Sequence, residues 1–483
     1  MAIPRKVALL PSISKPRGRV NPPRIWILAV AIIAITFRFW QLSRFNAFVF
    51  DEVYFVNFAQ DYRQGIAPID AHPPLGKYII AASIQLGEWW TSHADRLNAK
   101  EVIENSPFSY RQANALVGSL IPLAVVGIAR TLVPPTSSAA QRRKHWQFPF
   151  LCGIFVATDG LFVTESRYAL LNVHLVCLGL LSHWLWLKAA NISKAQSQPK
   201  REQTSLWLRI ASGCLLGGAI ATKWNGLGYL LSLIVWEIAR LRYSASDRQF
   251  GHCQNPTSKA TLRNLALLAI ATTFTYGLIW WPHLHITQEN IFSVHAYLFQ
   301  FHQQLSADGH AACSKWYSWP LLVRPITYWY STTNTHAYTV SNLGNPALWL
   351  LSSSTILLLA ISRILTSKRA IYFKPQLATA TSLQTTNLKS YLVISYFCNW
   401  LPWILVQRCT FNYLYMPAAV FSFMALAWLL STWLTSYSQI NKAIAWLLLS
   451  VIAIAFIFWS PLTFGWPLSF EQLQKRWLLK SWI

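Results

Sequence analysis

Long apolar runs separated by shorter polar segments make up most of this chain. A helix needs about 20 mostly apolar residues to cross the hydrocarbon core of a bilayer, and about eleven runs approach that length. The pattern therefore predicts an all-α polytopic membrane protein with about eleven transmembrane helices. The runs lie at 25–43, 112–132, 148–165, 168–187, 207–222, 225–239, 264–282, 346–362, 390–407, 411–433 and 441–459.

The composition agrees with a membrane protein rather than a soluble one. Hydrophobic residues make up 54% of the 483 positions and charged residues only 12%, with a mean hydropathy of +0.31. A soluble domain carries about a quarter charged residues. The 41 Lys and Arg against 16 Asp and Glu would suggest nucleic acid in a soluble protein. Here the basic residues lie mostly between apolar runs, where membrane orientation explains them, so we expect no nucleic-acid partner.

The placement of charge predicts the orientation of the chain. A basic leader precedes the first run, and basic segments recur in alternate connections at 142–144, 188–201, 240–263 and 363–389. Lys and Arg favour the cytoplasmic side, so the N-terminus is predicted to be inside, on a retained signal anchor rather than a cleaved signal peptide. The acidic residues follow the opposite rule, except for Glu202, Glu237 and Asp247. The working face then lies on the periplasmic or extracellular side of the cell membrane.

This topology divides the chain into three parts. Residues 1–24 are predicted to be a basic cytoplasmic leader, 25–459 a transmembrane domain, and 460–483 a non-cytoplasmic tail. Two outside loops, 44–111 and 283–345, are long, and ordered loops of this length are usually functional. The second loop is rich in Trp, Tyr and His, which argues against disorder. We therefore expect these two loops to form the active face.

Seven cysteines show neither a CxxC pair nor the spacing of a disulfide framework. Five of them lie in or beside apolar runs, where cysteine behaves as a small hydrophobic residue. We therefore expect neither a disulfide nor a metal site, and the sequence implies no cofactor and no divalent metal.

The first outside loop carries two adjacent carboxylates, Asp51 and Glu52, shortly after the first apolar run. Adjacent carboxylates at a membrane surface repel each other unless each has a task or a partner. Farther along, His72 and Lys77 flank a Pro-Pro turn. The plainer interpretations are an acidic turn that helps to set topology and a proline pair that begins a helix.

Other charged residues gather on the same predicted face. Any one of them could snorkel to the lipid headgroups, but snorkelling does not explain why acids and bases from separate segments converge. Together they predict a site for an anionic ligand with a general base nearby, which suits a lipid-linked phosphate donor held by Arg and Lys. These residues are Arg111, Asp159, Glu165, Arg167, Lys223, Arg324 and Arg408.

The motifs around these residues resemble those of the protein O-mannosyltransferases, polytopic transferases of the GT-C fold. The resemblance follows the order and spacing of several segments along most of the chain. These segments are 50–52, 72–77, 111–122, 159–171, 223–227, 319–328, 344–346, 401–403 and 411–413.

This resemblance implies transfer of mannose from polyprenyl-phosphate-mannose to Ser or Thr hydroxyls of exported proteins, with inversion at the anomeric carbon. It implies that Asp51 is the base and that Glu52 pairs with Arg111 to hold the loop in place. We expect the phosphate ligands among Arg167, Lys223, Arg324 and Arg408, on grounds of charge and side. Glu52 is counted with Asp51 in the expected catalytic set. Arg111, His72, Lys77 and Asp159 complete the expected substrate-binding set.

The chain departs from the family pattern in two respects. The family often has an acid where this chain has Asn172, and a Tyr-His pair where it has Asn412-Tyr413. Eukaryotic members also insert a β-trefoil MIR module into the second outside loop, for which 283–345 is too short. The resemblance is therefore to the bacterial type.

Three other functional classes are open at this point. A GT-C relative that glycosylates a lipid or glycan would use the same base and phosphate site. A transporter of lipid-linked sugars would need polar residues near the bilayer midplane and often inverted repeats, whereas these runs are mostly apolar without a recognisable repeat. A structural scaffold would leave Asp51 freely replaceable.

Overall fold

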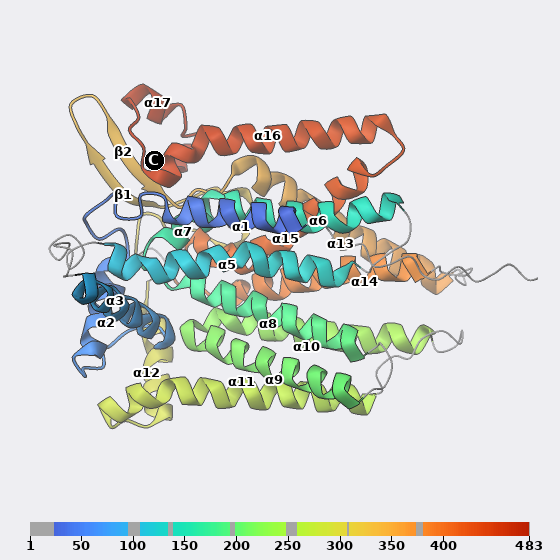
Figure 1. The fold of residues 1–483 in the computed structure, drawn as a ribbon, viewed down its shortest axis with the longest axis horizontal. Helices are drawn as coiled ribbons and strands as arrows, with labels where there is room; N and C mark the ends of the chain where they lie inside the picture. Colours follow the sequence, from blue (N-terminus) through green and yellow to red (C-terminus); the bar gives the residue numbers. More distant parts are fainter. Residues whose placement is uncertain are drawn as a thin grey trace, which may run out of the picture.

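A computed structural model describes residues 24–94, 107–133, 139–193, 199–247, 258–306, 309–372 and 380–482. Within these ranges, long helices run roughly parallel to one another in a bundle (Figure 1). Seven of the described helices are long and apolar enough to cross a membrane, or eight if a bent pair counts as one span. The shorter apolar helix Ile25–Phe39 lies beside them. The predicted all-α polytopic architecture is confirmed in its main features. The basic leader lies outside the described residues except for Arg24.

Each predicted apolar run coincides with helical residues of the bundle. The long elements are α1 (Arg24–Phe39), α5 (Phe108–Leu132), α6 (Ala139–Thr158), α7 (Gly160–Arg167), α8 (Asn172–Ser193), α9 (Pro199–Thr222), α10 (Leu227–Asp247), α11 (Ser258–Thr287), α13 (Pro346–Tyr372), α14 (Ala380–Trp400), α15 (Met416–Leu434) and α16 (Gln439–Phe464).

One predicted span is broken rather than straight. The axes of α6 and α7 meet at 57° around Asp159. The Asp159 side chain caps α7 by accepting from the Phe162 N–H, and its other oxygen accepts from Asn345 N at 2.9 Å and Trp349 Nε1 at 2.8 Å. A side chain that caps a new helix start stabilises the break, because it satisfies donors that the bend leaves free.

The core of the bundle is built around α15. Within the span 412–434, 94% of the most apolar window is buried, whereas α11 and α16 bury only 22% of theirs. Figure 1 shows α16 and α11 at opposite edges, with α15 between them. The exposed apolar faces of the outer helices therefore suit contact with lipid.

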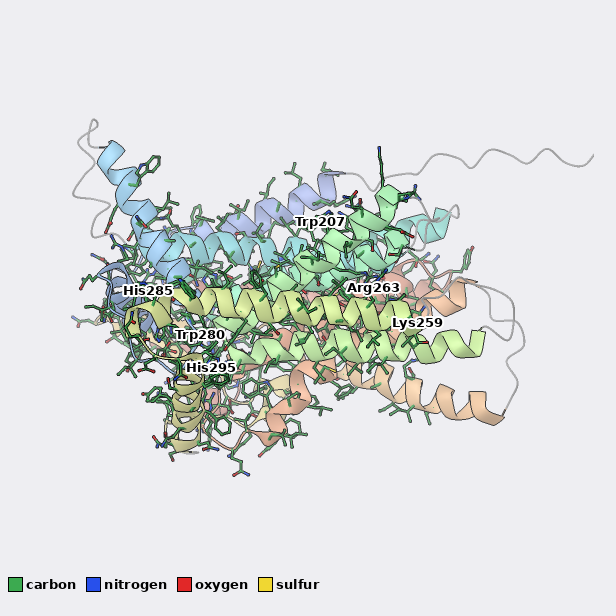
Figure 2. The ribbon with its side chains drawn as sticks, turned by 90° about the horizontal axis from the view of Figure 1, so that it is seen from below. Trp207, Lys259, Arg263, Trp280, His285 and His295 are labelled. Carbon is green, nitrogen blue, oxygen red and sulfur yellow. A yellow bond between two sulfur atoms is a disulfide. The ribbon has the colours of Figure 1, made fainter. Side chains whose placement is uncertain are left out.

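The ends of α11 differ in character. Figure 2 shows Lys259 and Arg263 towards one end of the helix, and Trp280 and His285 towards the other.

The backbones of α9 and α11 approach each other closely. A Cβ added at Gly217 of α9 would lie only 2.6 Å from the Thr272 carbonyl oxygen of α11. Close backbone contact at small residues is a usual way for helices to pack in membranes.

The described parts of the two loops predicted to lie outside are folded and lie at the same end of the bundle (Figure 1). They contain α2 (Glu52–Arg63), α3 (Leu75–Ala94), α12 (Ile291–Gln304) and an antiparallel hairpin of β1 (Thr327–Thr332) and β2 (Ala337–Ser341). The all-α prediction did not include this hairpin, because two short strands in an aromatic loop leave a weak pattern.

The C-terminal segment packs at this end as well. Beyond α16, which continues five residues past the predicted boundary at 459, Leu468 forms a β-bridge with Ala337. After α17 (Phe470–Gln474), the Trp482 indole donates to the Leu322 carbonyl at 2.8 Å. The tail and the second outside loop therefore form one structure.

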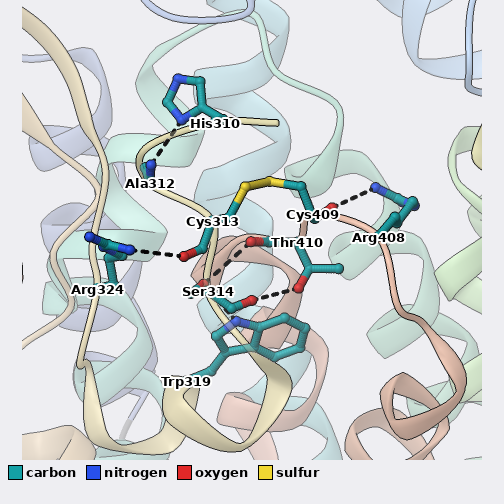
Figure 3. Close-up of a disulfide and its surroundings, with 9 residues drawn as sticks. All are labelled: His310, Ala312, Cys313, Ser314, Trp319, Arg324, Arg408, Cys409 and Thr410. Carbon is teal, nitrogen blue, oxygen red and sulfur yellow. Dashed lines mark hydrogen bonds between the residues drawn. A yellow bond between two sulfur atoms is a disulfide. The ribbon is translucent and has the colours of Figure 1, made fainter. Parts of the chain in front are cut away.

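The prediction that the cysteines form no disulfide was wrong. Cys313 and Cys409 are joined, with Cα atoms 5.2 Å apart and a sequence separation of 96. Figure 3 shows this bond between the second outside loop and the turn that follows α14, with Ser314 and Thr410 hydrogen-bonded beside it. Spacing rules missed the pair because only the tertiary fold brings the two segments together.

Candidate active site

A buried ion pair fixes the start of α2. Arg111 donates from Nε to Glu52 Oε1 at 2.8 Å and from Nη2 to Oε2 at 2.7 Å, and both side chains are fully buried. Glu52 also accepts the backbone N–H groups of Val49 and Ala169, each at 2.8 Å. The remaining Arg111 donors reach the carbonyl oxygens of Leu42, Phe45 and Ala47. With both side chains occupied, the pair ties the first outside loop to α5 and to the segment after α7.

Asp51 is held at the N-terminus of α2 without capping it. Its side chain makes no capping hydrogen bond with the helix. The preceding Phe50 adopts φ +55°, a left-handed conformation that costs about 1–2 kcal/mol in a non-glycine residue. Phe50 stacks on Tyr328 with ring centroids 4.2 Å apart and donates its N–H to the Tyr328 carbonyl. These contacts stabilise the turn that carries Asp51.

The surroundings of Asp51 bring its pKa close to neutrality. Burial raises the pKa of Asp51 to about 6, with Asp70 adding to the rise, whereas Lys223 and His310 oppose it. The group is thus ionised at neutral pH, and its proton affinity is higher than that of an ordinary aspartate. That is the property required of a general base.

Lys223 lies in the turn between α9 and α10, and the Asn172 side chain links it to the buried carboxylate of Glu165. Its ammonium donates to Asn172 Oδ1 at 3.2 Å and lies 5.1 Å from the centre of the Tyr413 ring. The Asn172 amide nitrogen donates to Glu165 Oε2 at 3.0 Å, and the Tyr328 hydroxyl donates to the other oxygen of Glu165. Where the family often has an acid, this chain therefore has an amide hydrogen-bonded to a carboxylate from α7.

A cavity of about 1120 Å³ opens between α10, α12, α14 and the turn after α14. Its walls combine an apolar part with a polar, basic part, as expected for a ligand with a lipid tail and an anionic head. The apolar lining includes Leu227, Leu230, Leu231, Ile234, Phe299, Pro402, Trp403, Leu405 and Val406. The polar lining includes His72, Lys223, Asn225, His302, Gln303, Asn399, Gln407 and Arg408.

Two histidines face each other in this cavity. The rings of His72 and His302 have centroids 5.9 Å apart. Burial lowers the pKa of both, to about 4 for His302, and the nearby Lys223 and Arg408 lower them further. Both rings are therefore neutral at neutral pH and serve as hydrogen-bonding groups, so Lys223 and Arg408 supply the positive charge.

Four further residues of the expected site are engaged elsewhere. Asp159 caps α7, as described above. Lys77 pairs with Asp70 and donates to the His72 carbonyl at 2.7 Å, which braces the Pro-Pro turn. Arg167 donates to carbonyl groups at the end of α1, including that of Trp40 at 2.7 Å. Arg324 donates to the Cys313 carbonyl at 3.5 Å (Figure 3). The cavity lining includes none of these four.

The sequence alone did not single out several residues that the structure adds to the site. Glu165 was predicted only to be one of several charged residues on the same face, without a specific role. Asn172 stood only as a departure from the family, and His302 is a lone histidine in an aromatic loop. No periodicity or motif marks these residues, because their proximity arises from segments far apart in the chain. Within the described ranges, no three His, Cys, Asp or Glu side chains cluster in a way that could hold a metal ion.

Comparison with known families identifies the relatives of this chain. Residues 28–288 match the family model described as dolichyl-phosphate-mannose-protein mannosyltransferase, and residues 287–482 match the C-terminal four-TMM region of protein-O-mannosyltransferase. The polyprenol-phosphate-mannose–protein mannosyltransferase of Corynebacterium glutamicum is 27% identical over 402 residues, covering 68% of this chain and 70% of that protein. The equivalent protein of Mycolicibacterium smegmatis is 24% identical, covering 58% of each chain. By contrast, the match spans only 27% of a Candida albicans relative.

Solved structures show the same fold. The Saccharomyces cerevisiae Pmt1–Pmt2 complex bound to the sugar donor superposes with a TM-score of 0.79 at 16% identity, over 97% of this chain and 93% of that one. ArnT of Cupriavidus metallidurans bound to undecaprenyl phosphate gives 0.52 at 13% identity, over 91% and 65%. The predicted resemblance and the predicted GT-C fold are both confirmed.

Proposed function

The chain belongs to the protein O-mannosyltransferase family, and we infer that it is a polyprenyl-phosphate-mannose–protein mannosyltransferase that acts on Ser and Thr hydroxyls of exported proteins. One observation carries the assignment of the site. A large cavity with an apolar wall and two cations, Lys223 and Arg408, lies close enough to Asp51 for Lys223 to oppose the rise in the pKa of that carboxyl. Asp51 is not among the residues that line the cavity, and Tyr413 lies between the two: its ring centre is 5.1 Å from the Lys223 ammonium and 6.2 Å from the ring centre of Phe50, which directly precedes Asp51.

The donor fits the cavity in one direction. Its polyprenyl tail would lie along the leucines and Ile234 of α10, where apolar burial is worth about 25 cal/mol per Å². Its phosphate would lie between Lys223 and Arg408, which neutralise the charge that develops on the leaving group. Neutral His72 and His302 are placed to hydrogen-bond the phosphate or the sugar. Arg167 and Arg324 are not part of this phosphate site, because neither lines the cavity and each donates to a backbone carbonyl.

The transfer is a single displacement. The acceptor hydroxyl oxygen attacks the anomeric carbon of mannose, and the bond from that carbon to the phosphate oxygen breaks. The lipid phosphate leaves with the bonding electrons, and the Asp51 carboxylate takes the hydroxyl proton. Attack from the face opposite the leaving group inverts the anomeric centre. Glu52 does not share this role in the proposal, since Arg111 and two backbone N–H groups occupy both of its oxygens.

The protein is a multi-pass membrane protein, and we propose that this site faces the non-cytoplasmic side. The charge pattern supports this orientation, because Lys259 and Arg263 lie at the end of α11 opposite the loops (Figure 2). The Cys313–Cys409 disulfide lies at the loop end and supports it further, since disulfides persist in oxidising compartments. Exported proteins are accessible on that side as acceptors.

A transfer assay in membranes tests the function. Wild-type protein is supplied with radiolabelled polyprenyl-phosphate-mannose and a Ser/Thr-rich secreted polypeptide, and is compared with Asp51→Asn. We expect label on hydroxyl side chains with the wild type and a loss of at least about 10²-fold with Asp51→Asn, since general-base catalysis contributes that much. Asp61→Asn is the matched control, because Asp61 lies near the C-terminal end of α2, whereas Asp51 is the residue at its N-terminus.

The alternative outcomes are separable. Label that moves into lipid or glycan, with none on the polypeptide, would assign the chain to GT-C enzymes that modify those acceptors. Full transfer by a folded Asp51→Asn variant would keep the enzyme and remove Asp51 as its base. Loss of transfer in Asp61→Asn would show that the assay reports damage to α2 rather than chemistry.

A further inference from the structure

A buried carboxylate outside the proposed catalytic set connects the two halves of the site. Glu165 is fully buried on α7, and both of its oxygens accept hydrogen bonds, one from the Tyr328 hydroxyl and one from the Asn172 amide. The Tyr328 hydroxyl in turn accepts from the Asn342 side chain at 3.1 Å. This pattern suits an ionised carboxylate, which only accepts.

The Asn172 amide transmits this charge towards the cavity. Its nitrogen faces the Glu165 carboxylate at 3.0 Å, and its oxygen accepts from the Lys223 ammonium at 3.2 Å. Only one orientation satisfies both neighbours, because a carboxylate cannot donate and an ammonium cannot accept. The amide dipole is thereby aligned between a negative and a positive group, and charge-assisted bonds of this kind are about twice as strong as neutral ones.

The other oxygen of Glu165 leads towards the acceptor side. Tyr328, which donates to it, stacks on Phe50 with an interplanar angle of 4°, and its carbonyl accepts the Phe50 N–H. Phe50 is the left-handed residue directly before Asp51. The Glu165 carboxylate is therefore linked to two parts of the site. Tyr328 links it to the turn that carries Asp51, and Asn172 links it to Lys223.

We propose that Glu165 is a positioning residue that acts through Asn172 to hold Lys223 charged and directed at the donor phosphate. This inference rests on the proposed function, because it names the source of charge balance for the phosphate site of that reaction. Two cations, Lys223 and Arg408, line the same cavity and repel each other when no donor is bound. The buried carboxylate of Glu165, when ionised, opposes that repulsion, so the site remains ready for an anion.

The electrostatic surroundings of Lys223 make the proposal measurable. Burial and Arg408 lower the pKa of Lys223 to about 8, whereas Asp51, Glu165 and Asp70 raise it. The ammonium loses its charge as pH rises through that value, so transfer should fall on the alkaline side. Removing the carboxylate of Glu165 lowers the pKa of Lys223 further and moves the alkaline limb to lower pH. The remaining groups around the lysine are His72, His302 and Tyr413.

The test is a charge exchange between positions 165 and 172. Glu165→Gln should lower kcat/KM by roughly 10- to 100-fold at pH 8, as for a modest misplacement of a substrate ligand, and move the alkaline limb of the pH profile downward. The double variant Glu165→Gln/Asn172→Asp returns a carboxylate to within contact of Lys223 and leaves an amide oxygen to accept from Tyr328. It should therefore restore kcat/KM to within about threefold and move the limb back up.

Glu237→Gln is the matched control, because Glu237 is a buried acid in the middle of α10, outside the cavity lining, that accepts from Trp186 and Arg240. It should leave transfer per folded molecule unchanged. If Glu165→Gln does not accumulate as folded protein, Asn172→Leu cuts the same link while keeping the carboxylate, and it should show the same shift of the limb.

A folded Glu165→Gln enzyme with an unmoved alkaline limb would overturn the proposal and leave Glu165 as a packing residue. Failure of the folded double variant to recover would overturn it as well, because a carboxylate needed at position 165 itself is not a positioning charge. Absence of transfer in the wild type would instead count against the proposed function.

Discussion

Replacement of Arg111 by Met should destabilise the protein without acting on the chemistry directly. The wild-type guanidinium makes two charge-assisted bonds to Glu52 and satisfies three backbone carbonyls, all in a fully buried setting. Its loss leaves the Glu52 carboxylate buried with only two backbone N–H donors. Removing one partner of a buried ion pair costs about 3–5 kcal/mol, and we expect a loss in that range.

The assay is a reversible unfolding titration with SDS in mixed micelles, run on the wild type, Glu52→Gln, Arg111→Met and the double variant. The double variant should be less destabilised than the sum of the single variants, because it leaves no unpaired charge behind. Wild-type stability of Arg111→Met would refute the reasoning. If Glu52→Gln abolished transfer but left stability unchanged, the structural role of the Glu52–Arg111 pair would be refuted, because Glu52 would then act in the chemistry.

Three other predictions concern the cavity and the face around it. Transfer should follow a bell-shaped pH profile. The rate should fall below about pH 6, where Asp51 is protonated, and above about pH 8, where Lys223 loses its charge. A flat profile between pH 5 and 9 would contradict both assignments. Arg408→Met should raise KM for the donor about tenfold or more with a smaller effect on transfer from saturated enzyme, and an unchanged KM would remove it from the phosphate site. Ser substitution at both Cys313 and Cys409 should raise KM for the donor in part, as Arg408→Met does, because Arg408 directly precedes Cys409. Kinetics measured under non-reducing conditions check this prediction. Wild-type kinetics in the double Ser variant would show that the disulfide does not position the arginine.

Short-range patterns were sufficient for the membrane architecture. The apolar run at 411–433 forms the buried centre of the bundle, whereas the run at 441–459 forms a helix that is largely unburied by the rest of the protein. Length and apolarity predict both helices equally well, because every spanning segment must satisfy its own backbone groups. They do not say which helix is central, since core and lipid are both apolar.

The same limit explains why the sequence predicted neither the disulfide nor the contacts of Asp159. Asp159 caps a helix and also accepts from Asn345 and Trp349, nearly 190 residues away. Cys313 and Cys409 have no local spacing to reveal them. Both cases depend on contacts between segments that meet only after the helices have packed.

The sequence by itself determined the class of protein, its family and the residues that carry charge at the active face. These properties follow from local apolarity and from motifs of a few residues, which each segment contains independently of its neighbours. Only the tertiary structure decided what each charge does: Arg111 is paired, Arg167 caps α1, and Lys223 faces the cavity with Glu165 behind it. The physical reason is that the task of a buried charge depends on its nearest partners, and those partners come from distant parts of the chain.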